Sequence, residues 1–162
     1  MHHWRIEYIF VDMSIIDEVL KDKKLEEVVY FLAERMMRRA REYSKAQFKK
    51  EKVDLTIDQW VILKRVSEEI GISQVEIASS TYKDPAAVTR ILDILVRKGF
   101  VTRMSKLDDR RAFEIHLTKA GAELVNRVIP MAQETREKGL EGLTERELKV
   151  LNKALKKIHD NF

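Results

Sequence analysis

Helix-start signals are the sequence feature that most limits what this chain can fold into. In a capping box, a Ser or Thr hydroxyl accepts from a free helix amide, and a Glu or Gln three residues later reaches back to the cap. Three such boxes are present: Thr56 with Gln59, Ser73 with Glu76, and Thr144 with Glu147. Asp84 followed by Pro85 marks a fourth helix start, and Gly99 marks the end of that helix. The middle of the chain therefore predicts three short helices, at about 57–70, 74–80 and 85–98.

Longer amphipathic helices are expected on both sides of these short ones. Apolar residues at helical spacing predict a helix from Leu25 to about Lys49, preceded by a turn or two from Ser14. After Thr118 two further stripes follow: Ala120, Leu124, Val128 and Met131, with Pro130 expected to kink the helix, and then Leu148, Leu151, Leu155 and Ile158. The small central unit cannot cover all these stripes, so a second copy of the chain is the simplest partner.

Two strands are expected after the third short helix. Phe113, Ile115 and Leu117 alternate with polar residues, which is the period of a half-buried strand, and an apolar segment at 100–102 precedes them. The chain is thus predicted to be mainly α with a small antiparallel β-hairpin. Its central order of helix, turn, helix and hairpin is that of a winged helix-turn-helix.

Composition excludes several classes of function. The chain has 162 residues, which suits one domain, and it contains no cysteine, so thiolate metal sites and cysteine-based redox sensing are excluded. No apolar run is long enough to span a membrane and no secretory signal is present, so a cytoplasmic protein without a membrane partner is expected. The four histidines are His2, His3, His116 and His159, and no pair has zinc-site spacing. No metal, cofactor or catalytic residue is expected, so the chain is not interpreted as an enzyme.

Positive charge is concentrated in one region. The net charge is only +4, but residues 83–111 hold eight basic side chains against four acidic ones. On the helix at 85–98 the residues expected to face outward are Pro85, Ala86, Thr89 and Arg90. An Arg can donate two bonds to guanine, and an Ala or a Thr methyl can meet a thymine methyl, as a major-groove reading helix requires. Ser80, Thr81 and Lys83 in the preceding turn add donors for phosphate. The alternative is that Arg90 is an ordinary solvated charge.

The charged tip between the strands, residues 103–113, gives a second candidate DNA contact. Arg110 or Arg111 would insert a guanidinium into the minor groove, while Asp109 would hold a neighbouring arginine such as Arg103 across the hairpin. Lys106 adds to the positive charge of the same tip. The alternative is a solubilising loop with incidental ion pairs.

Five segments, in order and at matching spacing, resemble the MarR family of winged-helix transcriptional regulators. They are LTIDQW (55–60), SQVEIA (73–78), AVTRILDILVRKGFVTR (87–103), DDRRA (108–112) and LTKAG (117–121). The resemblance implies a homodimer with interlocking N- and C-terminal helices and two winged lobes on a pseudo-palindromic DNA site. It places Thr89 and Arg90 on the recognition helix and Asp109, Arg110 and Arg111 in the wing motif.

Many members of that family lose DNA affinity when a small, often aromatic, molecule binds near the dimerisation helices. By this resemblance Met36, Tyr43 and Trp60 are candidate effector contacts; the alternative is that all three are ordinary core residues. The sequence also departs from the family pattern, because Ile94 and Val96 stand where charged residues are usual and Lys83 where an apolar one is common.

These expectations combine into one interpretation. The chain is a single MarR-like domain, with dimerisation helices at 1–54 and 118–162 around a winged helix-turn-helix at 55–117. It is expected to be a homodimeric, ligand-responsive repressor of double-stranded DNA sites. The competing interpretation is a winged-helix protein-interaction module in which Ile94 and Val96 dock a partner.

Overall fold

The computed structural model of this chain describes residues 24–105 and 113–162. It divides into two units, residues 1–39 and residues 40–162, which are described one at a time. The boundary falls inside one helix, α2 (Val29–Lys50).

The described part of the first unit is a short 3-10 turn, η1 (Leu25–Glu27), followed by the first residues of α2. The prediction of one continuous helix from Leu25 is wrong at its start, because the backbone of Val28 is extended and the α-helix begins at Val29. A 3-10 turn spaces its side chains almost as an α-helix does, so the apolar pattern does not separate the two. Leu25, Val29, Leu32 and Met36 are each between 46% and 61% exposed.

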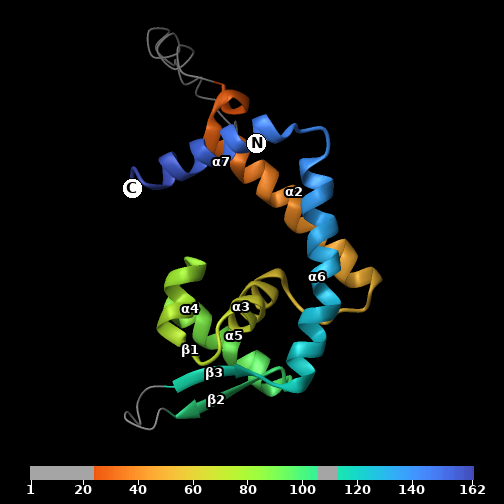
Figure 1. Ribbon diagram of the computed structural model, residues 1–162, viewed down its shortest axis with the longest axis vertical. Coiled ribbons are helices and arrows are strands. Elements are labelled where there is room, and N and C mark those ends of the chain that lie inside the picture. Colours follow the sequence, from red (N-terminus) through yellow and green to blue (C-terminus); the bar gives the residue numbers. More distant parts are fainter. Residues whose placement is uncertain (1–23, 106–112) are drawn as a thin grey trace, which may run out of the picture. The chain divides into compact units, whose positions relative to one another are not determined.

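The second unit contains the remaining helices and a small sheet (Figure 1). In chain order its elements are the end of α2, α3 (Ile57–Glu68), β1 (Ile72–Ser73), α4 (Gln74–Thr81), α5 (Pro85–Arg97), β2 (Val101–Ser105), β3 (Phe113–Leu117), α6 (Lys119–Leu140) and α7 (Glu145–His159). All three predicted capping boxes form, at the starts of α3, α4 and α7. The fold class is confirmed as mainly helical with a small antiparallel sheet.

Two details of the predicted elements differ from the structure. Helix α3 ends at Glu68 rather than Ile70, because Glu69 is extended and Gly71 has a positive φ of 73°. The sheet has three strands in the order β1-β3-β2, where two were predicted. The extra strand is only Ile72–Ser73, and it pairs with β3 through Ile72 opposite Ile115. Two residues are too few to show an alternating pattern.

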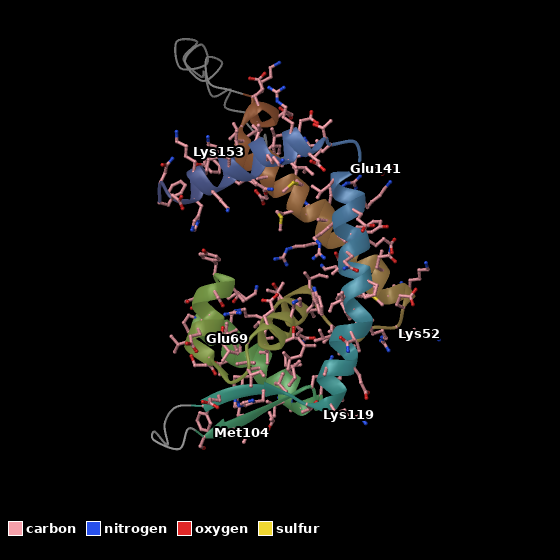
Figure 2. All side chains as sticks on the ribbon, viewed as in Figure 1. Lys52, Glu69, Met104, Lys119, Glu141 and Lys153 are labelled. Atoms are coloured by element: carbon pink, nitrogen blue, oxygen red, sulfur yellow. The ribbon has the colours of Figure 1, made fainter. Side chains whose placement is uncertain are left out.

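The hairpin of β2 and β3 is antiparallel and pairs Val101 with Leu117 and Ser105 with Phe113. Figure 2 shows Met104 on β2 near the tip end of this hairpin and Lys119 in the first turn of α6 near the other end. Of the three predicted apolar positions in β3, Ile115 is fully buried and Leu117 is partly buried, whereas Phe113 is 45% exposed. Phe113 is the first residue of β3 and is not part of the core.

One hydrophobic core joins the short helices to the sheet and to the first half of α6. Its fully buried side chains come from six elements: Ile62, Leu63, Ile72, Ile77, Val88, Leu92, Leu95, Ile115 and Val128. At roughly 1.5–3 kcal/mol for each buried aliphatic side chain, this cluster is the main stabilising term for residues 55–128. Helices α3, α4 and α5 are thereby held in a fixed arrangement against the strands.

The buried face of α6 is offset from the predicted stripe. Gly121, Val125 and Val128 are buried, while Ala120 is exposed. A Cβ built on Gly121 would lie 2.0 Å from the Phe100 carbonyl oxygen, so the missing side chain lets the helix start directly against the segment that follows α5. Counting only large apolar residues overlooks a contact made by the backbone of a glycine.

The end of α5 and the start of α6 are tied together by Thr118. Its hydroxyl donates to the Gly99 carbonyl at 2.6 Å and accepts from the Gly121 N–H at 3.0 Å. Its own N–H donates to the Phe100 carbonyl at 3.1 Å. Gly99 has a φ of 73°, as predicted for the residue that ends this helix, and only glycine takes that conformation without strain.

Candidate nucleic-acid interface

Helix α5 is anchored by one face. Val88, Leu92 and Leu95 are fully buried, and Ile91 is partly buried against the same core. These side chains form the inward face of the helix. Because the three buried side chains span most of the helix, the opposite surface is presented rigidly.

The opposite surface of the N-terminal half of α5 is open to solvent. The Asp84 carboxylate accepts from the Ala87 N–H at 3.0 Å and caps the helix. Pro85, Ala86 and Arg90 are exposed, and Arg90 has no ion-pair partner among the residues that the structure describes. The small side chains allow close approach of another molecule, and the guanidinium of Arg90 is available to it.

Thr89 lies on the same half of α5 but is held by two hydrogen bonds. Its hydroxyl donates to the Pro85 carbonyl at 2.9 Å and accepts from Gln74 Nε2, in the first turn of α4, at 2.6 Å. Sequence reasoning missed Gln74, because nothing in the spacing of two residues fifteen apart shows that their side chains meet. The only available signal was the position of Gln74 directly after a cap.

Lys83, in the turn between α4 and α5, is engaged inside the unit. Its Nζ lies 2.6 Å from Asp58 Oδ1, and the Lys83 side chain is only 19% exposed. Arg41 Nη1 from α2 lies 3.4 Å from the same oxygen. The hydrogen bond from Lys83, with the positive charges of Lys83 and Arg41, holds the pKa of Asp58 below its ordinary value, although partial burial opposes this shift. Asp58 thus joins α2 and α3 to the turn before α5.

Ser80 and Thr81 use their hydroxyl protons within α4. Ser80 donates to the Glu76 carbonyl and Thr81 to the Ile77 carbonyl, both at 2.6 Å. Ser80 also accepts from Arg65 Nε at 3.0 Å. To donate to a phosphate, each hydroxyl would first have to break its hydrogen bond to the backbone carbonyl.

Arg103 on β2 is paired with the third short helix. Its Nη1 lies 2.7 Å from Asp93 Oδ1 of α5, and its Nη2 is buried without a hydrogen-bond partner among the described residues. Asp93 was not predicted as a partner. The other predicted tip residues lie outside the described residues: Lys106, Asp109, Arg110 and Arg111. The structure therefore shows the base of the wing and its attachment to α5.

Taken together, these elements form a helix-turn-helix, α4 and α5, followed by a hairpin wing. Residues 55–113 match the model of the MarR family. This segment is similar to the MarR family of regulators. The resemblance predicted from the sequence is confirmed.

Solved structures of similar chains agree with this assignment. A cysteine-to-serine variant of E. coli MarR in complex with operator DNA is 26% identical, with 89% of this chain and 97% of that chain covered and a TM-score of 0.70. The transcriptional regulator SlyA is also 26% identical, over 82% of this chain and 92% of that one, with a TM-score of 0.77. BpsR of Bordetella bronchiseptica, whose DNA binding is regulated by 6-hydroxynicotinic acid, shares the fold at 24% identity, 86% and 98% coverage and a TM-score of 0.78.

Tyr43 and Trp60, two of the predicted effector contacts, line separate recesses of the second unit. Tyr43 lines a recess with Glu134, and its hydroxyl donates to Glu134 Oε1 at 2.8 Å. Trp60 lines a separate recess between α3 and the end of α4, and also packs against the hydrophobic core of the second unit. Met36 belongs to the first unit and is exposed.

Three further features bear on the alternatives. Val96, on the C-terminal half of α5, is 37% exposed and Ile94 is partly buried, so the extra apolar surface of this helix is modest. Within residues 24–105 and 113–162 no group of three or more His, Asp or Glu side chains is placed to hold a metal ion. No described helix is long and apolar enough to cross a membrane.

Proposed function

We propose that this chain is a cytoplasmic, sequence-specific regulator of transcription that binds double-stranded DNA as a homodimer and acts as a ligand-responsive repressor. Residues 55–117 supply the two DNA-reading lobes, and the helices at 1–54 and 118–162 supply the dimer interface. The operator is a pseudo-palindrome, since a two-fold symmetric protein presents the same reading surface twice.

The observation that carries this proposal is the surface of α5. Pro85, Ala86 and Arg90 are exposed on a helix whose opposite face is fully buried, so a rigid reading surface stands out from the fold. This is the geometry that a major-groove helix needs, and Arg90 is suited to guanine. The operator complex of the similar E. coli protein supports the same use of this fold.

A dimer is supported by apolar side chains that the described residues leave open. On α7 the predicted stripe is half exposed, with Leu151 at 41% and Leu155 at 43%, and no residue of that helix is buried. Leu25, Val29 and Leu32 are exposed in the first unit. Burial of such stripes against a second copy releases about 25 cal/mol for each Å² of apolar surface.

Selection of bound sequences from a random pool of duplexes tests the proposal as a whole. The expected result is an inverted repeat whose half-sites lie about one helical turn apart, with centres roughly 34–36 Å from each other. Enrichment of no sequence would remove the regulator proposal. A single unrepeated site would leave DNA reading in place and remove the symmetric dimer.

The alternative, a protein-docking module, rests on the exposure of Val96 and is separated from DNA reading by salt. Affinity for the selected duplex should fall steeply, with a slope of log K against log salt of about −0.9 for each phosphate contacted. Docking on apolar surface has no such dependence. Val96→Ser should leave DNA affinity unchanged, because Val96 lies on the C-terminal half of α5, away from the exposed reading residues.

The effector part of the proposal rests on Tyr43, Trp60 and Met36. A small aromatic ligand bound in the recess of Tyr43 or in that of Trp60 would lower DNA affinity by favouring an arrangement of the lobes unsuited to the operator. Titration of aromatic carboxylates into the protein–operator complex, with Trp60→Phe and Tyr43→Phe as variants, tests this. Release of DNA that is unchanged by both variants would move the effector site elsewhere.

A further inference from the structure

This inference rests on the proposed function and names the chemistry that one residue reads. We propose that Thr89 recognises the C5 methyl group of a thymine in the major groove, and that Gln74 is the positioning residue that restricts Thr89 to this role. The sequence suggests a methyl contact from this helix but does not show what holds the Thr89 hydroxyl.

The first step concerns the proton of the Thr89 hydroxyl. A hydroxyl has one proton to donate, and in this structure that proton goes to the Pro85 carbonyl, with the two oxygens 2.9 Å apart. Pro85 lies one turn earlier on the same helix, so this bond moves with α5 as a rigid part of it. Thr89 cannot make this bond and donate to a base in the same position.

The second step concerns the acceptor side of the same oxygen. Gln74 Nε2 donates to Thr89 Oγ1 at 2.6 Å, from a partly buried position in the first turn of α4. Together the two bonds fix the oxygen between α4 and the backbone of α5. Rotation of χ1 to aim the hydroxyl at DNA would break both bonds, at about 1 kcal/mol or more each.

The third step follows from what remains of the side chain. Because both bonds hold the hydroxyl, the methyl is the part of the Thr89 side chain that is left to contact DNA. Its neighbours Pro85 and Ala86 on the exposed surface are also apolar and small. In the major groove, thymine is the base that presents a methyl, while adenine N7, guanine N7 and O6, and thymine O4 would each need a donor. A patch of small apolar groups that offers no proton therefore selects thymine.

Arg90, next to Thr89, supplies the contrasting chemistry. Its guanidinium donates and suits guanine, so the two neighbouring side chains would read different bases of one half-site. This separation makes the role of Thr89 measurable without loss of the contact made by Arg90.

The test uses the full-length protein and the duplex found by selection. Each thymine of both half-sites is replaced in turn by deoxyuridine, which lacks only the C5 methyl. For the wild-type protein, replacement of one particular thymine in each half-site, at symmetry-related positions, should lower the affinity for the duplex about fourfold per half-site. This is the loss expected for one buried methyl group. Other thymines should show no loss.

Two near-isosteric variants separate the methyl from the hydroxyl. Thr89→Val keeps a methyl and removes the hydroxyl, so the sensitivity to deoxyuridine should remain. Thr89→Ser keeps the hydroxyl and removes the methyl, so the fourfold loss should disappear at that position alone. Gln74→Met keeps the side-chain length without the donor, and should reduce the sensitivity; Val75→Ala, at an exposed neighbouring position, is the matched control and should not.

Each outcome bears on a different statement. A wild-type protein that binds its operator but ignores every deoxyuridine replacement overturns the inference and leaves the proposed function standing. The same holds if Thr89→Ser keeps the sensitivity or Thr89→Val loses it, with circular dichroism showing both variants folded. Full sensitivity in Gln74→Met removes Gln74 from the positioning role. A protein that selects no duplex at all overturns the proposed function itself.

Discussion

Arg90 has no ion-pair partner among the described residues, and it lies on a helix whose opposite face is buried. The Arg90 guanidinium is therefore available to another molecule. The edge of a guanine offers it two acceptors, O6 and N7. Arg97, about two turns further along the same helix, is exposed in its last turn. The two arginines therefore form a natural pair for comparison.

Arg90→Ala should weaken discrimination at one base pair of the operator by about 1–3 kcal/mol, with little change at other positions. Arg97→Ala should lower affinity for all sequences equally or leave it unchanged. Competition binding with single-base operator variants measures both effects. An unchanged base preference in Arg90→Ala would show that this residue does not read sequence.

Asp58 is the residue whose ionisation is linked to stability. Its pKa lies below the ordinary 3.8, so the folded chain binds this proton less readily than the unfolded chain does. The ion pair therefore stabilises the fold at pH above 3.8, and this contribution disappears as the pH falls through the lower folded pKa.

Asp58→Asn should lower the free energy of unfolding by about 1 kcal/mol at pH 7, a modest value because the carboxylate is partly exposed. The difference between wild type and variant should shrink below about pH 4. Urea denaturation at several pH values measures it. Glu123→Gln, which removes an exposed carboxylate from α6, is the control and should cause no comparable change. If the difference between wild type and Asp58→Asn persisted in acid, the ionisation of Asp58 would not be linked to stability.

At the scale of elements, caps within one helical turn are predictable from the sequence, whereas contacts between distant elements are not. The capping boxes and the end of α5 at Gly99 depend on residues within one turn, so the sequence alone reveals them. Strand β1 exists only because Ile72 pairs with Ile115, far along the chain. The partner of Thr89 and the partner of Arg103 were missed for the same reason, since each lies on a different element.

Helix α6 contains two glycines with opposite surroundings. Gly121 faces the Phe100 carbonyl with no room for a Cβ, whereas a Cβ on Gly139 would have no atom within 4 Å. Gly121→Ala should destabilise the protein by roughly 1–3 kcal/mol through steric overlap with backbone. Gly139→Ala should stabilise the helix by up to about 1 kcal/mol. Thermal and urea unfolding compare them; equal effects would show that the start of α6 can shift away from Phe100.

At the scale of the whole molecule, the question is what covers α7. Its exposed leucines suggest a second copy of the chain, and a charge placed among them should prevent association. Leu151→Lys is expected to yield monomers in sedimentation equilibrium and to weaken operator binding at least tenfold, because one lobe then binds without the other. Asn152→Lys adds the same charge beside it on the polar side of α7. A dimer that survives Leu151→Lys would place the interface elsewhere.

The bonds of Thr118 join the segment just after α5, at Gly99 and Phe100, to the first turn of α6 at Gly121. Because these bonds hold the two helices together at one point, a tilt of α6 would also shift the end of α5. In a symmetric pair of chains, the angle of α6 would then set the distance between the two copies of α5 in successive major grooves. Under the proposed function, a ligand that changed this angle would weaken binding to the operator.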